Sequence, residues 1–347
     1  MNSKNRYKEL DSLRGIAALL VVFFHFTMGR EEHNFFLRIG TTGVDLFFII
    51  SGFVIFMSLQ NVASDTEFVI NRFTRLYPTY WASVCFTFIL IISISIYRGN
   101  GITKDILIQF FGNLTMFQFY MGIPDLDGPY WTMIIEMLFY IFMLVLFQIN
   151  CLKHIDRIGL VICFIIVVIK YLFPELYFIN LIIKWIPLLQ FFPLFFSGII
   201  FYKLHNSLIK KTKGYLLIFS CFFCQIMLFQ SSGRSVNFIS WAQYGFILFI
   251  YFIIFLLFVN KNLKFIINPL TLFVGKISFA LYLIHQYISL NIIIPFFYER
   301  LGINFWATVI LINLPIIICI ASFITYKIEI PYSKKLKLKL LGMELNN

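Results

Sequence analysis

The sequence has few charged residues for its length. Only 13% of its 347 residues are charged, whereas soluble domains carry about 25%. Apolar residues make up 60% of the chain, and the mean hydropathy is +0.87. This composition excludes a soluble globular protein.

Cysteine is also sparse, and the six cysteines form no recognisable framework. Cys221 and Cys224 have the spacing of half a metal or redox site. Neither a second cysteine pair nor a nearby histidine accompanies them, so packing within an apolar segment is the favoured role. We therefore expect no disulfide scaffold, no metal site and no tightly bound cofactor.

The chain lacks a long polar region, a low-complexity tract and an internal repeat. Its longest polar stretches are residues 61–76, residues 98–106 and the tail from residue 327. We therefore expect a single transmembrane domain over residues 1–347, without an appended soluble domain.

Apolar runs near the length that crosses a bilayer, about 20 residues, recur along nearly the whole chain. They predict an all-α, polytopic membrane protein with about ten transmembrane helices. We place Pro78 at the start of the third helix, because proline is common in the first helical turn. The predicted spans are residues 12–28, 43–60, 78–97, 130–149, 158–173, 188–203, 214–230, 239–259, 270–294 and 305–326.

The positive charge is distributed unevenly between the predicted loops. The formal net charge is +12, and a cytoplasmic N-terminus puts most of the 28 Lys and Arg residues on the cytoplasmic side. The positive-inside rule therefore predicts a cytoplasmic (inner) membrane protein with both termini in the cytoplasm. Nucleic-acid binding would need a soluble basic face, which this chain is not expected to have.

The first predicted helix contains a buried titratable ring. His25 is the one ionisable side chain between Gly15 and Phe26, and Arg14 precedes this run. Arg14 and His25 share a helix face and lie roughly 16 Å apart along the axis. His25 is suited to act as a general base near neutral pH. It could equally serve as a packing residue that hydrogen-bonds across helices.

Two carboxylates also enter predicted spans. Asp45 lies at the start of the second span, where a carboxylate needs a cationic or histidine partner, so we consider it as an orienter of His25. Glu136 lies about two turns into the fourth span, and buried carboxylates are functional candidates. It could be protonated, pair with an arginine or bind an acceptor hydroxyl. Ser51 and Gly52 in the second span favour close helix packing.

Two further groups combine polar residues at helical spacing. Arg72 and Arg75 lie on the same predicted side as Arg14, where their guanidinium groups could bind the phosphates of a donor. Ordinary positive-inside charge is the other explanation for them. Ser278, Tyr282 and His285 are spaced by four and three residues and predict a polar stripe inside the bundle.

These motifs occur in the order found in a known family. The chain resembles the acyltransferase-3 family of integral-membrane acyltransferases, which includes O-antigen and exopolysaccharide O-acetylases. The resemblance runs nearly end to end. It rests on residues 10–19 with His25, 43–54, 72–78, Tyr130 and Trp131 with Glu136, Phe139 and Tyr140, 278–285 and 329–331.

The resemblance implies that Arg14 and His25 are essential. It also implies family hallmarks at Phe47, Phe48, Ser51, Gly52, Arg72 and Arg75. An acyl-CoA, most simply acetyl-CoA, is the implied cytoplasmic co-substrate, and a glycan or lipid-linked glycan is the implied acceptor.

The expected function is therefore transfer of acetyl from acetyl-CoA to a hydroxyl of a cell-surface or envelope polysaccharide. The alternative is a proton-coupled transporter or flippase of a lipid-linked glycan, in which the buried His and acidic residues form a proton relay. A non-catalytic subunit of a glycan-assembly complex is a third hypothesis. The oligomeric state, the acceptor and the depth of transfer are left open by the sequence.

Overall fold

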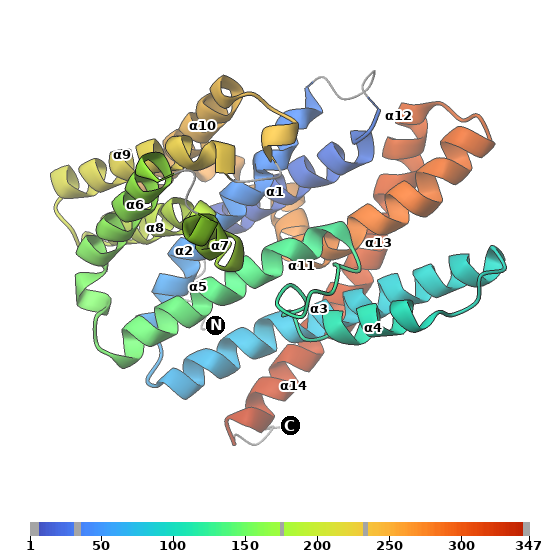
Figure 1. Cartoon of the computed structure of the whole chain (residues 1–347), viewed down its shortest axis with the longest axis horizontal. Helices are drawn as coiled ribbons and strands as arrows, with labels where there is room; N and C mark the ends of the chain where they lie inside the picture. The colour runs from blue at the N-terminus through green and yellow to red at the C-terminus, as the bar shows by residue number, and fades with distance from the viewer. Residues whose placement is uncertain (1–6, 31–35, 174–176, 232–234, 343–347) are drawn as a thin grey trace. The chain divides into compact units, whose positions relative to one another are not determined.

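The computed structural model describes residues 7–30, 36–173, 177–231 and 235–342 (Figure 1). Every regular element in these ranges is helical, and no strand occurs among them, which confirms the all-α prediction. The α-helices are α1 (Lys8–Thr27), α2 (Gly43–Leu59), α3 (Asp65–Tyr97), α4 (Lys104–Asn113), α5 (Trp131–Gln148), α6 (Ile155–Leu172), α7 (Tyr177–Trp185), α8 (Leu188–His205), α9 (Lys211–Leu228), α10 (Trp241–Val259), α11 (Pro269–Ile288), α12 (Phe305–Ala307), α13 (Leu314–Phe323) and α14 (Ile330–Leu340).

Eight helices of the described chain are long and apolar enough to cross a membrane. They coincide with eight of the predicted spans, so the polytopic membrane class is confirmed. The other two predicted spans, 158–173 and 214–230, fall on α6 and α9. Both are 18-residue helices with charged residues near an end. These are Asp156, Arg157 and Lys170 in α6, and Lys211 and Lys213 in the first turn of α9. Such charges make an apolar helix less distinct as a membrane span. The total of about ten spans and the cytoplasmic termini stay predictions.

The third helix begins earlier than the sequence indicated. We expected it to start at Pro78, but α3 runs from Asp65 to Tyr97 with Pro78 inside it. A proline in a helix interior removes one backbone hydrogen bond, which a membrane helix tolerates when neighbouring groups satisfy the freed carbonyl. The earlier start places Arg72 and Arg75 on a regular helix, one turn apart.

The residues form two compact units by their contacts. The first unit comprises Met1–Phe24, Glu31–Asp65 and Ile135–Gly275, and the second comprises His25–Arg30, Thr66–Ile134 and Lys276–Asn347. Three helices, α1, α5 and α11, therefore contribute several residues to both units, and α3 contributes its first residue, Asp65, to the first unit and the rest to the second.

Close packing of α2 against α8 forms the centre of the first unit. A Cβ atom on Gly52 would overlap the carbonyl oxygen of Phe195, and one on Gly198 would overlap that of Ile49. Small residues at a helix crossing allow such close approach of two backbones in a membrane. The ring of Phe48 stacks on that of Phe195, with centroids 4.7 Å apart. The Gly52 position is thus fixed by packing.

In the second unit, the segment between α3 and α5 is folded by its own polar contacts. The Asn113 side chain donates to the carbonyl of Pro124 at 2.9 Å and accepts from the backbone N–H of Leu126 at 3.0 Å. The indole of Trp81 in α3 donates to the carbonyl of Leu114 at 2.9 Å. This glycine-rich segment is therefore an ordered cap against α3.

The last two long helical segments contain π-helical turns. After α11, these turns cover Ser289–Ile293 and Pro295–Arg300. Two more, Thr308–Asn313 and Ile324–Glu329, interrupt the segment from α12 to α14. Such turns are frequent at functional sites, because they redirect side chains that a regular helix would hold in register. Glu329 lies at the end of the last π-helical turn.

Candidate active site

Two histidines far apart in the sequence are in direct contact in the second unit. His25 lies near the C-terminal end of α1, and His285 lies in α11. Nε2 of His285 is 3.0 Å from Nδ1 of His25. The His285 side chain is fully buried, with 0% exposure. The sequence identified both rings but gave no signal that they pair.

The backbone of α11 determines which nitrogen of each ring carries a proton. Nδ1 of His285 lies 2.7 Å from the carbonyl oxygen of Tyr282 and 3.2 Å from that of Leu281. Both neighbours are acceptors, so this nitrogen must be the N–H donor. In the neutral ring, Nε2 of His285 is then an acceptor, and Nδ1 of His25 must donate to it. Nε2 of His25 is consequently the basic nitrogen of the pair.

The predicted stripe of Ser278, Tyr282 and His285 is buried on one side of α11. The Tyr282 hydroxyl lies 3.1 Å from that of Thr132, at the start of α5. The Thr132 hydroxyl also donates to the carbonyl of Pro129 at 3.1 Å. These bonds join the start of α5 to the turn of α11 that precedes His285, so they restrict how that histidine can move.

Tyr130 and Trp131 directly precede Thr132, which contacts Tyr282. Tyr130 is fully buried, and its ring packs against Tyr80 of α3 with centroids 5.1 Å apart. Its hydroxyl lies 3.4 Å from that of Thr87. Trp131 is half-buried and begins α5. The Tyr130 position therefore acts as an anchor between α3 and the start of α5.

Asp127 is a site residue that sequence reasoning missed. Its carboxyl accepts from the backbone N–H of Gly128 at 2.8 Å and from that of Tyr287 at 3.1 Å. Burial raises the pKa of Asp127 to about 8, although these two N–H groups favour the carboxylate. The contact fixes α11 two residues beyond His285. In the sequence, the position of Asp127 before Gly128 and Pro129 predicts only a turn.

A second polar contact in this unit involves the arginines predicted to bind a donor. Nη1 of Arg75 lies 2.6 Å from Oε1 of Glu329, and the two side chains are 47% and 5% exposed. The guanidinium of Arg72 lies 5.8 Å from the ring centroid of Phe68. Arg75 is thus oriented by a buried carboxylate, while about half of its side chain stays accessible to an anionic ligand.

The remaining predicted site residues lie in the first unit. The carboxylate of Glu136 accepts from the hydroxyl of Ser51 at 3.3 Å and from the hydroxyl of Tyr140. Asp45 is 3% exposed and lies beside the side chain of Tyr244 in α10. Ser51 and Glu136 are therefore partners, which their positions in the sequence did not indicate. Phe47 and Phe48 follow Asp45 on α2, and Arg14 lies on α1.

Comparison with known proteins identifies the family. The profile of the acyltransferase-3 family, described as an acyltransferase domain, matches residues 7–326. A stretch of 77 residues is 39% identical to BcsY of Komagataeibacter xylinus, to which the role of a membrane-bound transacylase is attributed. That match spans 22% of this chain and 18% of BcsY, so it covers a small part of either protein.

No solved structure matches the chain significantly. The profile match, however, covers nearly the whole chain and includes the two histidines, Arg72, Arg75 and Glu136. The described helices include eight of membrane-spanning length. The chain is an integral membrane protein that belongs to the acyltransferase-3 family of acyltransferases.

Proposed function

We propose that this membrane acyltransferase transfers an acetyl group from acetyl-CoA to a hydroxyl of a cell-surface or envelope polysaccharide. The observation that carries the proposal is the hydrogen bond between His25 and His285. It supplies a half-buried base whose tautomer is fixed by a fully buried partner, as general-base catalysis on a hydroxyl requires.

In the proposed reaction, Nε2 of His25 removes the proton of the acceptor hydroxyl as its oxygen attacks the thioester carbonyl. The new C–O bond forms the ester, the C–S bond breaks, and the leaving thiolate takes the proton from His25. Nδ1 of His25 donates to His285 before and after protonation, because both nitrogens of an imidazolium are donors. The hydrogen bond between His25 and His285 is therefore kept throughout the transfer.

The Arg72 and Arg75 pair is the proposed site for the phosphates of coenzyme A. Guanidinium groups bind phosphate oxygens in pairs, and these two lie one turn apart on α3. Glu329 holds Arg75 in place through the 2.6 Å contact. We place this site on the cytoplasmic side of the inner membrane, where acetyl-CoA is available.

Arg14, Asp45 and Glu136 are assigned supporting roles in this proposal. Ser51 and Tyr140 hold the Glu136 carboxylate, which could then orient an acceptor hydroxyl. We favour direct transfer over a covalent serine intermediate, because the 3.3 Å contact of the Ser51 hydroxyl is to a carboxylate, without the histidine of a recognisable triad.

The test measures alkali-labile acetyl on surface glycans from cells with wild-type protein or His25→Ala at matched membrane abundance. His154→Ala is the matched control, because His154 is an exposed histidine outside this site. We expect one ester signal to disappear in His25→Ala alone, with the amount of glycan unchanged. An unchanged ester pattern with glycan missing from the surface would contradict the proposal and favour a transporter.

A further inference from the structure

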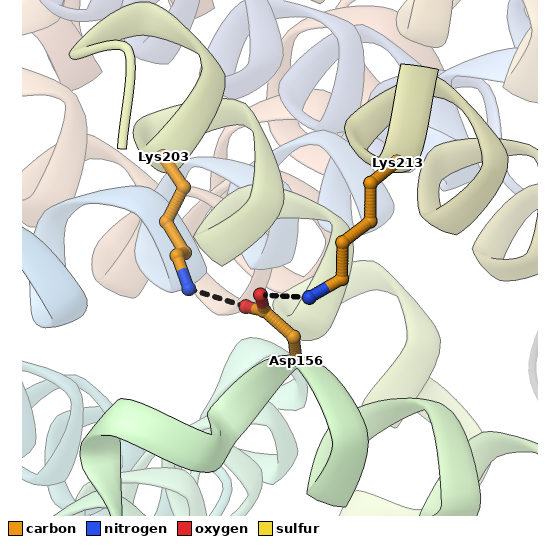
Figure 2. Close-up of polar contacts among 3 residues, drawn as sticks. All are labelled: Asp156, Lys203 and Lys213. Atoms are coloured by element: carbon orange, nitrogen blue, oxygen red, sulfur yellow. Dashed lines mark hydrogen bonds and ion pairs between the residues drawn. The ribbon is translucent and has the colours of Figure 1, made fainter. Parts of the chain in front are cut away.

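An ion cluster in the first unit, with Asp156 and Lys203 buried, joins three helices (Figure 2). Asp156, at the start of α6, accepts from Nζ of Lys203 at the end of α8 and from Nζ of Lys213 at the start of α9, the latter at 2.9 Å. Burial by itself would raise the pKa of Asp156, but the two ammonium groups outweigh it and lower that pKa below its ordinary value. Both carboxylate oxygens are therefore used within the protein.

More cations surround this cluster than its single carboxylate can neutralise. The ends of α6, α8 and α9 and their connections contribute four further exposed basic residues. Within the ranges that the structure describes, none of the four forms an ion pair. We call the set the α6–α8–α9 basic cluster; it consists of Lys153, Arg157, Lys203, Lys210, Lys211 and Lys213, with Asp156.

The direction of α9 adds to the excess of positive charge. Lys210 is its N-cap and makes no side-chain capping bond, and no acidic residue lies in the first turn. The N-terminal end of a helix carries a partial positive charge that favours anions and disfavours lysine. The three lysines at residues 210, 211 and 213 thus oppose the helix dipole. An anion at this place would relieve their mutual repulsion.

Exposed apolar side chains lie directly beside these cations. Leu208 precedes the lysines and is 54% exposed, while Tyr215 and Leu216 follow them and are 40% and 63% exposed. In a membrane protein, such side chains at a helix end contact acyl chains, and neighbouring lysines contact headgroups. The surface therefore offers both parts of a phospholipid a matching environment.

We propose that the α6–α8–α9 basic cluster binds the headgroup of an anionic phospholipid. The phosphate lies among Lys210, Lys211 and Lys213, and the acyl chains lie along Leu208 and Leu216. The Asp156 contacts hold the three helix ends at the spacing that this site requires. Basic clusters at the cytoplasmic membrane surface recognise anionic lipids by this chemistry. The inference is independent of the acetyl-transfer reaction.

The test uses the purified full-length protein after delipidation in detergent. Phosphatidylglycerol is added, and the bound lipids are measured by native mass spectrometry together with the thermal unfolding temperature. We expect the variant Lys210→Gln/Lys211→Gln to bind about 30-fold more weakly, since each lysine near an anionic surface contributes about 1 kcal/mol. This variant leaves Asp156, Lys203 and Lys213 unchanged.

The matched control is Lys334→Gln/Lys335→Gln, which removes the same charge from exposed positions of α14. The control should keep wild-type binding, and phosphatidylcholine with the same acyl chains should bind weakly to all three proteins. Equal loss in both variants would overturn the proposal, because it would indicate general electrostatic adsorption. Competition by millimolar inorganic phosphate to the same extent as by phosphatidylglycerol would also overturn it. If the double variant fails to fold, Lys210→Gln against Lys334→Gln provides the same comparison with one charge.

Discussion

Nε2 of His285 lies 3.0 Å from Nδ1 of His25, although the two residues are 260 positions apart in the sequence. His285 in turn donates from Nδ1 to the backbone of its own helix. Because each of the two rings donates from its Nδ1, Nε2 of His25 is the nitrogen that can act as the base. His285 orients His25 as the carboxylate of a catalytic triad orients its histidine, with an imidazole in place of the carboxylate.

Replacing His285 with alanine should slow acetyl transfer while His25 stays present. Without the acceptor at Nε2, the His25 ring loses its fixed tautomer and orientation, so we expect a loss of roughly 10²-fold, within the range of general-base effects. The measurement is the initial rate of label transfer from acetyl-CoA in membranes with matched protein content.

His285→Gln is the companion variant, because its amide oxygen can accept the N–H of His25. It should recover part of the rate and should leave the KM for acetyl-CoA unchanged. Wild-type activity in His285→Ala would show that the contact does not determine the base. Equal loss in both variants, with altered protein abundance, would point to a purely structural role.

Replacing Glu329 with glutamine should weaken donor binding. The amide keeps a hydrogen bond to Arg75 but loses the charge, and charge-assisted bonds contribute roughly 1.5–3 kcal/mol. We expect the KM for acetyl-CoA to rise about tenfold or more, with a smaller change in kcat. The measurement is a saturation curve with acetyl-CoA.

Glu299→Gln is the matched control for that experiment. Glu299 accepts from Arg30 at the same distance of 2.6 Å, and its side chain is 52% exposed. Glu299 is not part of the proposed donor site, so the KM of the Glu299→Gln variant for acetyl-CoA should stay at the wild-type value. Similar KM changes in the two variants would remove the special role of Glu329.

Replacing Asp156 with asparagine should destabilise the first unit. The variant leaves Lys203 buried without a counter-charge, and breaking such a pair costs about 3–5 kcal/mol. Differential scanning fluorimetry in one detergent would measure the loss as a lower unfolding temperature. Asp105→Asn on α4 is the control, because Asp105 is exposed, and it should change the temperature little.

The same residue predicts a pH dependence. The pKa of Asp156 in the folded protein lies below its ordinary value of 3.8. Its contribution to the free energy of unfolding is therefore fully present well above pH 4 and is lost as the pH falls through the folded pKa. The wild-type protein should lose stability on acidification more steeply than Asp156→Asn. If the stability of the two proteins fell equally with pH, the predicted contribution of the Asp156 ion pairs would be contradicted.

Adding one methyl group at Gly52 should disrupt the crossing of α2 and α8. The Cβ of Gly52→Ala would overlap the backbone of Phe195, which cannot move independently. Overpacking of this kind costs about 1–3 kcal/mol or more. The measurement is again the unfolding temperature of the purified protein, together with its yield in membranes.

Gly245→Ala in α10 is the control for Gly52→Ala. The nearest atom to its Cβ would be Cδ1 of Ile226 at 3.7 Å, an ordinary contact. Because alanine is a better helix former by about 1 kcal/mol, this variant should be as stable as wild type or more stable. Equal destabilisation of both variants would show that the crossing is not unusually close.

The sequence supported the fold class well because the signals for it are local. Apolar runs of membrane length predicted eight of the helices that the structure contains. Charged residues near the ends of α6 and α9 make these two helices less distinct as membrane spans. The early start of α3 was missed because Pro78 is a stronger local signal for a helix start than the polar residues that precede it.

The candidate site was predictable as a set of residue types, and its pairings were not. Helical spacing placed Ser278, Tyr282 and His285 in one stripe, but it could not reveal that His285 contacts His25. The sequence predicts Arg75 as a phosphate ligand. It does not predict the ion pair of Arg75 with Glu329, because the two residues are 254 positions apart. Asp127 has the sequence context of an ordinary turn residue, and only the fold brings the backbone N–H of Tyr287 to its carboxylate.

Local patterns in the sequence were sufficient to predict an all-helical membrane protein of the acyltransferase-3 family, with a histidine and an arginine on its first helix. These properties depend on composition, hydrophobic runs and ordered motifs, which are all local along the chain. The tertiary structure alone decided which nitrogen of His25 is basic, which carboxylate holds Arg75, and which lysines share Asp156. Each of these depends on a distance of about 3 Å or less between separate helices, and helix packing sets that distance.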